Sequence, residues 1–170
     1  MNRFNPALPV IVAGLGLAAL WLSYRDLSPA QAMTSHGTEV KTLTTVPLDA
    51  GMEAVVTLDN VTGELTGYVL DRFTGKFFIE YHYNVAADFS LKRGVRPRFS
   101  MVSGLADFRQ FSENERLADG AIYVSEDTTG LLVAYGLPWN SQFRASTAPP
   151  QQRKFVKLDF ADTRRIPLRE

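Results

Sequence analysis

The sequence predicts a mainly β fold: a single antiparallel sandwich, open barrel or curled sheet of about seven to nine strands, with an N-terminal hydrophobic helix. Short runs rich in β-branched and aromatic residues follow one another along the chain, with turn residues between them. No amphipathic helix of crossover length separates these runs, which argues against a parallel βαβ sheet. A D-x-x-T-G pattern also recurs between neighbouring runs, as hairpin turns would require.

Composition limits the classes of protein to which the chain can belong. A length of 170 residues with 45% hydrophobic and 11% aromatic residues suffices for one packed domain. The 18 basic and 18 acidic residues give a formal net charge of +0, so we expect no nucleic-acid partner, although this balance allows a local cationic patch. The absence of cysteine excludes disulfides, thiolate zinc sites and cysteine nucleophiles.

The N-terminal part of the chain predicts an export segment. Residues 4–24 carry no charge and Arg3 precedes them, which predicts a cytoplasmic N-terminus and an exported C-terminal domain. A secretory signal peptide would be cleaved after Ala32, at the small-x-small pattern A-Q-A, whereas a retained anchor would use the whole uncharged run. Both alternatives place the domain in the cell envelope, either membrane-anchored and facing the periplasm or secreted to it.

The predicted domain organisation follows from this segment. Residues 1–32 are the signal peptide or membrane anchor, residues 33–38 a polar linker, and residues 39–170 a single β-rich exported domain. A buried amphipathic helix explains the first segment less well, because the apolar run has no polar stripe. The side chains that would hold an anchor in the bilayer are Leu8, Val10, Ile11, Val12, Leu15, Leu17, Leu20, Trp21 and Leu22.

Eight runs in the domain have the composition of strands. They are residues 39–46, 53–59, 64–71, 76–83, 98–103, 120–126, 131–137 and 153–160. Alternation is clearest in 76–83, where one face should carry Phe77, Ile79, Tyr81 and Tyr83. The opposite, partly wet face should carry Phe78, Glu80 and His82.

Two stretches interrupt the strands. Asn84 is a suitable N-cap for residues 84–89, which predicts a short helical turn. Residues 104–119 are more polar and should form a helix or a long loop. Farther on, residues 147–150 should break the strand pattern, and residues 166–168 should form an edge strand or an extended end.

The D-x-x-T-G pattern predicts a turn geometry. It occurs at residues 59–63 and 71–75, and a looser copy, E-x-x-T-G, occupies residues 126–130. The first carboxylate can accept backbone N–H groups from the residues that follow, and glycine supplies the positive φ that closes the turn. The pattern therefore predicts hairpins at all three places and a three-stranded meander over residues 53–83.

The segment from Leu70 to Lys76 also resembles the blade repeat of quinoprotein-type β-propellers. That repeat recurs at about forty residues, whereas the glycines of the three copies lie at positions 63, 75 and 130. A single chain of 170 residues is also too short for the several blades of a closed propeller. The resemblance is therefore local, and we expect no cofactor.

Five spaced segments carry a longer resemblance. They are TLDNVTGELTGYVLDRFTGKFF, YNVAADF, MVSGLADF, AIYVSEDTTGLLVAYGLPW and FVKLDF. Together they span about residues 53–160, and the pattern resembles an uncharacterised family of envelope-anchored proteins from planctomycete bacteria. The resemblance implies a hydrophobic N-terminal segment and an all-β body; it brings no known activity and no functional residues.

The sequence contains no evident catalytic constellation, and we assign no catalytic, cofactor or metal residue. Glu80 and His82 share a strand face and could chelate a metal with Asp88 as a third ligand; the alternative is a cross-strand pair on the surface. Paired carboxylates for glycoside hydrolysis would require two side chains that only the fold brings together. The candidates are Asp59, Asp71, Glu80, Asp88, Glu126 and Asp127.

One charge cluster predicts a binding site for anions. It comprises Lys92, Arg93, Arg96 and Arg98. Such a patch could hold anionic polysaccharide or lipid headgroups, and the alternative is a solvated loop.

The sequence thus favours a non-enzymatic binding or assembly module of the cell envelope. The alternative is an exported hydrolase of envelope polysaccharide that uses paired carboxylates. The expected partners are the membrane, through the N-terminal segment, and an envelope protein, a polysaccharide or a second copy joined by strand pairing.

Overall fold

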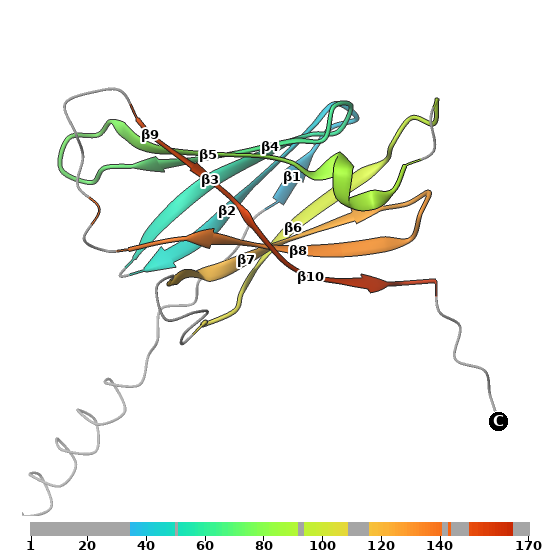
Figure 1. The fold of residues 1–170 in the computed structure, drawn as a ribbon. Coiled ribbons are helices and arrows are strands. Elements are labelled where there is room, and N and C mark those ends of the chain that lie inside the picture. The colour runs from blue at the N-terminus through green and yellow to red at the C-terminus, as the bar shows by residue number, and fades with distance from the viewer. Residues whose placement is uncertain are drawn as a thin grey trace, which may run out of the picture. The chain divides into compact units, whose positions relative to one another are not determined.

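The computed structural model describes residues 35–49, 51–91, 94–108, 116–140, 143 and 150–164. These residues fall within one compact unit, residues 33–170, and most of them are in strands (Figure 1). The expected export segment, residues 1–32, lies outside the described residues, as do residues 109–115, 144–149 and 166–168. In the described part of the chain, no helix has the length and apolarity that crossing a membrane requires.

The strands form two sheets (Figure 1). Sheet A contains, in spatial order, β1 (Ser35–Gly37), β2 (Lys41–Asp49), β3 (Met52–Asp59), β4 (Glu64–Leu70), β5 (Phe77–Asn84) and β9 (Gln151–Lys154). Sheet B contains, in spatial order, β10 (Val156–Asp162), β8 (Leu131–Pro138), β7 (Leu117–Glu126) and β6 (Phe99–Leu105). A 3-10 helix, η1 (Val85–Phe89), follows β5.

The mainly β prediction is confirmed, whereas the number and direction of the strands differ from it. The meander of β3, β4 and β5 is antiparallel, as expected. The described residues form ten strands, because residues 35–37 of the expected linker pair with β2 and the run 153–160 is divided between β9 and β10. The fold is not purely antiparallel, since β9 pairs parallel to β5. The chain between β5 and β9 includes η1 and the sheet B strands β6, β7 and β8, so no tight hairpin forces these two strands to be antiparallel.

A β-bulge changes the predicted faces of β5. The register against β4 shifts between Val69 and Leu70, and Phe78 is the extra residue at this shift. Phe77 is therefore turned outward and is 53% exposed, while Phe78 joins the core. Alternation predicted the reverse for both residues, because it assumes an unbroken pleat. The predicted inward positions of Ile79, Tyr81 and Tyr83 are confirmed.

The helical turn after β5 is confirmed. The Asn84 side chain accepts a hydrogen bond from the N–H of Ala86 (3.0 Å), which is N-cap geometry. The turn ends at Ser90, whose φ of 48° lies in the left-handed region. Residues 104–119, for which the sequence predicts a helix or a long loop, are partly strand. The first residues of this stretch belong to β6 and the last ones to β7.

Side chains from both sheets form one core, and the sheets are joined along both sides. On one side the chain crosses from β9 to β10 through Phe155, which is 2% exposed (Figure 1). The ring centroid of Phe155 lies 5.4 Å from that of Tyr81, and a Cβ on Gly67 would be 2.9 Å from the Phe155 ring. On the other side the Ser103 hydroxyl of β6 donates to the carbonyl oxygen of Thr45 in β2 (2.6 Å).

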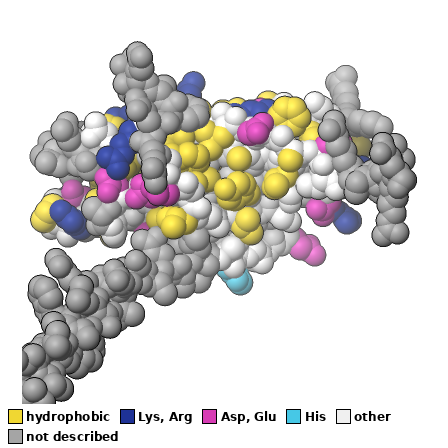
Figure 2. Space-filling view, turned by 90° about the horizontal axis from the view of Figure 1, so that it is seen from below, with side chains coloured by type: hydrophobic (Ala, Val, Ile, Leu, Met, Phe, Trp, Pro, Cys, Tyr) yellow, Lys and Arg dark blue, Asp and Glu magenta, His cyan; other side chains and the backbone are white. Residues whose placement is uncertain are grey.

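The outer face of sheet B is largely apolar. Two adjacent rows cross it: Val102, Tyr123, Ala134 and Asp159 in one, and Ser100, Ser125, Leu132 and Ala161 in the other. Asp159, on the edge strand β10, is the only charged member of these rows. Figure 2 shows hydrophobic side chains gathered over the middle of this face.

Candidate binding site at the loop end of the domain

The D-x-x-T-G segments form the turns that the sequence predicts. In the first turn the Asp59 carboxylate accepts the N–H groups of Thr62 (2.9 Å) and Val61 (2.8 Å), and these bonds lower the pKa of Asp59. Asp71 accepts N–H groups at the same two spacings in the second turn. Positive φ angles of 73°, 66° and 71° close the three turns at Gly63, Gly75 and Gly130.

The third turn is built on a buried glutamate. Glu126 is 0% exposed, and its carboxylate accepts the N–H groups of Thr128 (3.1 Å) and Thr129 (2.7 Å). The same carboxylate accepts the Thr128 hydroxyl and the backbone N–H of Arg98 (3.1 Å). Burial by itself raises the pKa of Glu126, but these hydrogen bonds outweigh it and hold the pKa at about 2. A charged side chain therefore ties this turn to the start of β6.

Two of the three turns lie at the same end of the domain. Residues 60–61 of the first turn and residues 128–129 of the third contribute to two hollows that meet at the segment 94–98, where Val95 lines one hollow and residues 96–98 line the other. We call this end, formed by residues 38–40, 59–63, 94–98 and 126–130, the loop end. Loops held by rigid sheets are a common place for binding sites in β domains.

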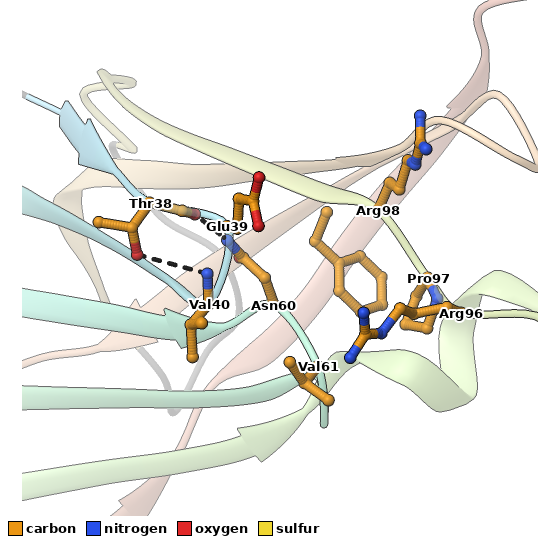
Figure 3. A pocket seen from close by; sticks show the side chains of 9 residues that line it. Thr38, Glu39, Val40, Asn60, Val61, Arg96, Pro97 and Arg98 are labelled. Carbon is orange, nitrogen blue, oxygen red and sulfur yellow. Dashed lines mark hydrogen bonds between the residues drawn. The ribbon is translucent and has the colours of Figure 1, made fainter.

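A hollow of about 620 Å³ is lined in part by residues 96–98, and we call it the arginine groove (Figure 3). Its lining residues are Thr38, Glu39, Val40, Asn60, Val61, Arg96, Pro97, Arg98 and Phe99. Figure 3 shows Arg96 reaching toward Val61, whereas Arg98 points away from Arg96. Neither arginine forms an ion pair with another described residue. Glu39 is the one acidic residue among those that line the groove.

Asn60 holds the opposite wall of the groove in place. This side chain is buried; its amide donates to the carbonyl oxygen of Thr38 (2.9 Å), and its oxygen accepts the Thr42 hydroxyl (3.2 Å). The backbone N–H of Asn60 donates to the carbonyl oxygen of Val40 (2.8 Å). One residue of the first turn therefore fixes the segment that leads into β2.

A second hollow, of about 510 Å³, borders the 94–98 segment at Val95. It is lined by Ser90, Leu91, Val95, Thr128, Thr129 and Arg164. The guanidinium of Arg164 donates to the carbonyl oxygen of Asp127. Its side chain also lies against Gly130, where any Cβ would clash with it. The turn glycine therefore makes room for the arginine that lines this hollow.

The structure places two of the four predicted cations at the site. Arg96 and Arg98 line the arginine groove, whereas Lys92 and Arg93 lie outside the described residues. Sequence reasoning missed Arg164, which is far from this cluster in the chain and comes to the loop end because β10 pairs with β8. It also missed the role of Asn60. No sequence signal distinguishes Asn60 from the exposed Arg72 at the same position of the second turn.

Five of the six candidate catalytic carboxylates, all except that of Asp127, accept hydrogen bonds from other described groups. None of the six lines the arginine groove or the second hollow. Those that begin the three turns accept turn N–H groups, as described above. Asp88 accepts hydrogen bonds from the Tyr135 hydroxyl (2.9 Å) and from Nζ of Lys157 (3.0 Å). Burial is the main cause that raises the pKa of Tyr135, and the hydrogen bond to Asp88 raises it further.

Glu80 and His82 lie together on the outer face of β5, as predicted, with a carboxylate oxygen 3.1 Å from Nε2 of His82. Gln152 of β9 donates to the other Glu80 oxygen (2.6 Å), and this bond contributes most to the lowered pKa of Glu80. Asp88, the predicted third metal ligand, contacts Lys157 instead. The part of the chain that the structure describes contains no group of three or more potential metal ligands.

Comparisons with protein-family models, with curated proteins and with solved structures find no match to this chain. What the loop end can bind therefore follows from its two hollows and from the charges that line them.

Proposed function

We propose that the protein is a non-enzymatic binding module of the cell envelope, built on a sandwich of the two sheets, whose loop end captures an anionic ligand. The observation that carries this proposal is the arginine groove, where Arg96 and Arg98 line a hollow and form no ion pair with a described residue. A guanidinium presents planar N–H donors that suit carboxylate and phosphate groups. Apolar side chains beside it, such as Val40 and Val61, can exclude water and strengthen such a contact.

The walls of the groove support binding rather than catalysis. Asn60 and Glu126 are buried and hold the two walls through hydrogen bonds to backbone groups. A preformed groove loses less conformational entropy when a ligand enters. The candidate catalytic carboxylates lie outside it, so the hydrolase alternative has no corresponding support.

The export segment supplies the location in this proposal. The uncharged run 4–24 after Arg3 favours delivery of the domain to the periplasmic side, whether the segment is cleaved or retained. The resemblance to envelope-anchored planctomycete proteins supports the same location. Anionic polysaccharides and lipid headgroups would then be the accessible ligands.

Retention on a heparin column at low ionic strength tests the proposal. We expect the full-length chain in non-ionic detergent to be retained and an Arg96→Ser/Arg98→Ser double variant to elute at lower salt, because salt screens such contacts. Arg72→Ser is the matched control, since its turn joins β4 to β5 at the end of the domain away from the groove. Equal retention of the wild type and the double variant, at equal thermal midpoints, would refute the proposal.

Assembly with a second copy is a second candidate, and the outer face of sheet B favours it. The two rows across this face carry only Asp159 as a charged residue, so two copies could approach with little charge repulsion. Replacing Val102, which is 53% exposed, with lysine should then convert dimers to monomers in light-scattering measurements. Val55→Lys, on the outer face of sheet A, is the control. A wild type that stays monomeric at all concentrations would exclude this candidate.

A further inference from the structure

The second hollow extends the site beyond a single anion. We infer that the ligand of the loop end is a linear anionic polysaccharide that crosses the 94–98 segment. One anionic group lies in the arginine groove and another in the second hollow. This inference rests on the proposed function of the arginine groove and names the ligand class for the same end of the domain.

The two hollows are separated by a single stretch of backbone. Val95 lines the second hollow, and its neighbour Arg96 lines the arginine groove. Pro97 disfavours the helical conformation for Arg96, which is consistent with neighbouring side chains that line different hollows. A polymer therefore has to cross only this one stretch of backbone to reach both hollows.

The charged side chains that line the two hollows suit a ligand with separated anionic groups better than a ligand that carries all its charge at one point. The arginine groove is lined by two arginines and one glutamate, Glu39, so one anionic group balances its charge. The second hollow supplies one more guanidinium, from Arg164, whose hydrogen bond to the carbonyl oxygen of Asp127 holds it at the rim. A ligand with anionic groups at intervals along a chain satisfies both hollows, whereas an isolated anion satisfies one.

The common wall is held rigidly, which favours a ligand that engages both sides. The N–H of Arg98 donates to Glu126 (3.1 Å), and the carbonyl oxygen of Arg98 accepts the N–H of Asp127 (3.1 Å). The 94–98 segment is thus fastened to the turn that lines the second hollow. When two sites have a fixed separation, a linked ligand binds the second site at high effective concentration. A chain-like ligand gains this advantage, and a monovalent anion does not.

Calorimetric titration of the full-length chain in non-ionic detergent with a heparin disaccharide and a heparin dodecasaccharide tests the inference. We expect the dodecasaccharide to bind the wild type at least about tenfold more tightly than the disaccharide. Arg96→Gln and Arg164→Gln should each weaken dodecasaccharide binding about tenfold, because each removes a charge-assisted contact. Arg164→Lys keeps the charge and should retain most of the affinity. Arg72→Gln is the control and should bind as the wild type does.

The outcomes separate the inference from the proposed function. Absence of binding both to the two oligosaccharides and to phosphatidylglycerol vesicles would overturn both. Equal affinity for the two lengths, with an effect of Arg96→Gln and none of Arg164→Gln, would leave the anion site and overturn the spanning ligand. Binding to phosphatidylglycerol vesicles that both substitutions weaken, without dodecasaccharide binding, would also overturn it and assign the hollows to lipid headgroups. A loss caused by Arg164→Gln and equally by Arg164→Lys would overturn the anionic contact in the second hollow, because packing against Gly130, and not charge, would then explain the loss.

Discussion

The buried carboxylate of Glu126 accepts the backbone N–H of Arg98 at 3.1 Å, and this bond joins residues 28 positions apart in the chain. The same carboxylate closes the turn at 126–130, so one side chain fixes both the turn and the cationic segment beside it. The backbone of Arg98, one of the two arginines that line the groove, is therefore positioned by a residue that does not line it.

The stability of the protein should depend on the ionisation of Glu126. Its pKa is about 2 in the folded state against an ordinary value of 4.5, so its stabilisation is complete above about pH 5 and is lost as the pH falls toward 2. This shift corresponds to about 3 kcal/mol. Urea unfolding of the full-length chain at several pH values should show that the wild type loses about that much more than Glu126→Gln between pH 6 and pH 2. Parallel pH profiles for the two proteins would contradict the prediction.

Asn60→Ala should destabilise the fold, because it leaves the Thr42 hydroxyl and the carbonyl oxygen of Thr38 without this buried partner. We expect a loss of about 1–3 kcal/mol in the free energy of unfolding, measured in urea. Arg72→Ala is the matched control, because Arg72 occupies the same position in the second turn and is exposed. A loss that is no larger for Asn60→Ala than for Arg72→Ala would show that the buried bonds do not hold the wall.

The turn glycines should differ in their tolerance of alanine. Gly75→Ala should cost about 1–2 kcal/mol, because its φ of 66° is strained for a residue with a Cβ, although nothing lies within 4 Å of the added atom. Gly63→Ala carries a similar strain and also places its Cβ 2.9 Å from Cβ of Ala86 in η1. It should therefore cost at least about 1 kcal/mol more. Equal losses in thermal or urea unfolding would show that η1 moves away freely.

Phe155→Ala should be among the most damaging single changes. The substitution empties the space between Tyr81 and Gly67 at the point where the chain passes between the sheets. We expect a loss of about 3–5 kcal/mol in the free energy of unfolding, by analogy with other buried aromatic truncations. Phe73→Ala is the control, since Phe73 is 83% exposed and its truncation should change the midpoint little. A comparable loss in the free energy of unfolding for both variants would contradict the role of Phe155 in the core.

Features that depend on neighbours in the chain were predictable. The carboxylates of Asp59 and Asp71 reach only two and three residues ahead, so the sequence pattern specifies those turns. The N-cap of η1 is equally local, because Asn84 bonds to Ala86. Alternation failed at Phe77, since a bulge depends on how two strands fit together and not on the composition of one.

The sequence by itself determined that the chain is mainly β, where most of its strands and turns lie, and that a cationic segment follows η1. Only the tertiary structure decided that β9 joins β5 in parallel and that Glu126 is buried against Arg98. The same is true of Arg164, which the fold brings beside residues 127–130. The physical reason is range: turn and strand signals act over a few residues, whereas these contacts arise from the packing of two sheets whose members are far apart in the chain.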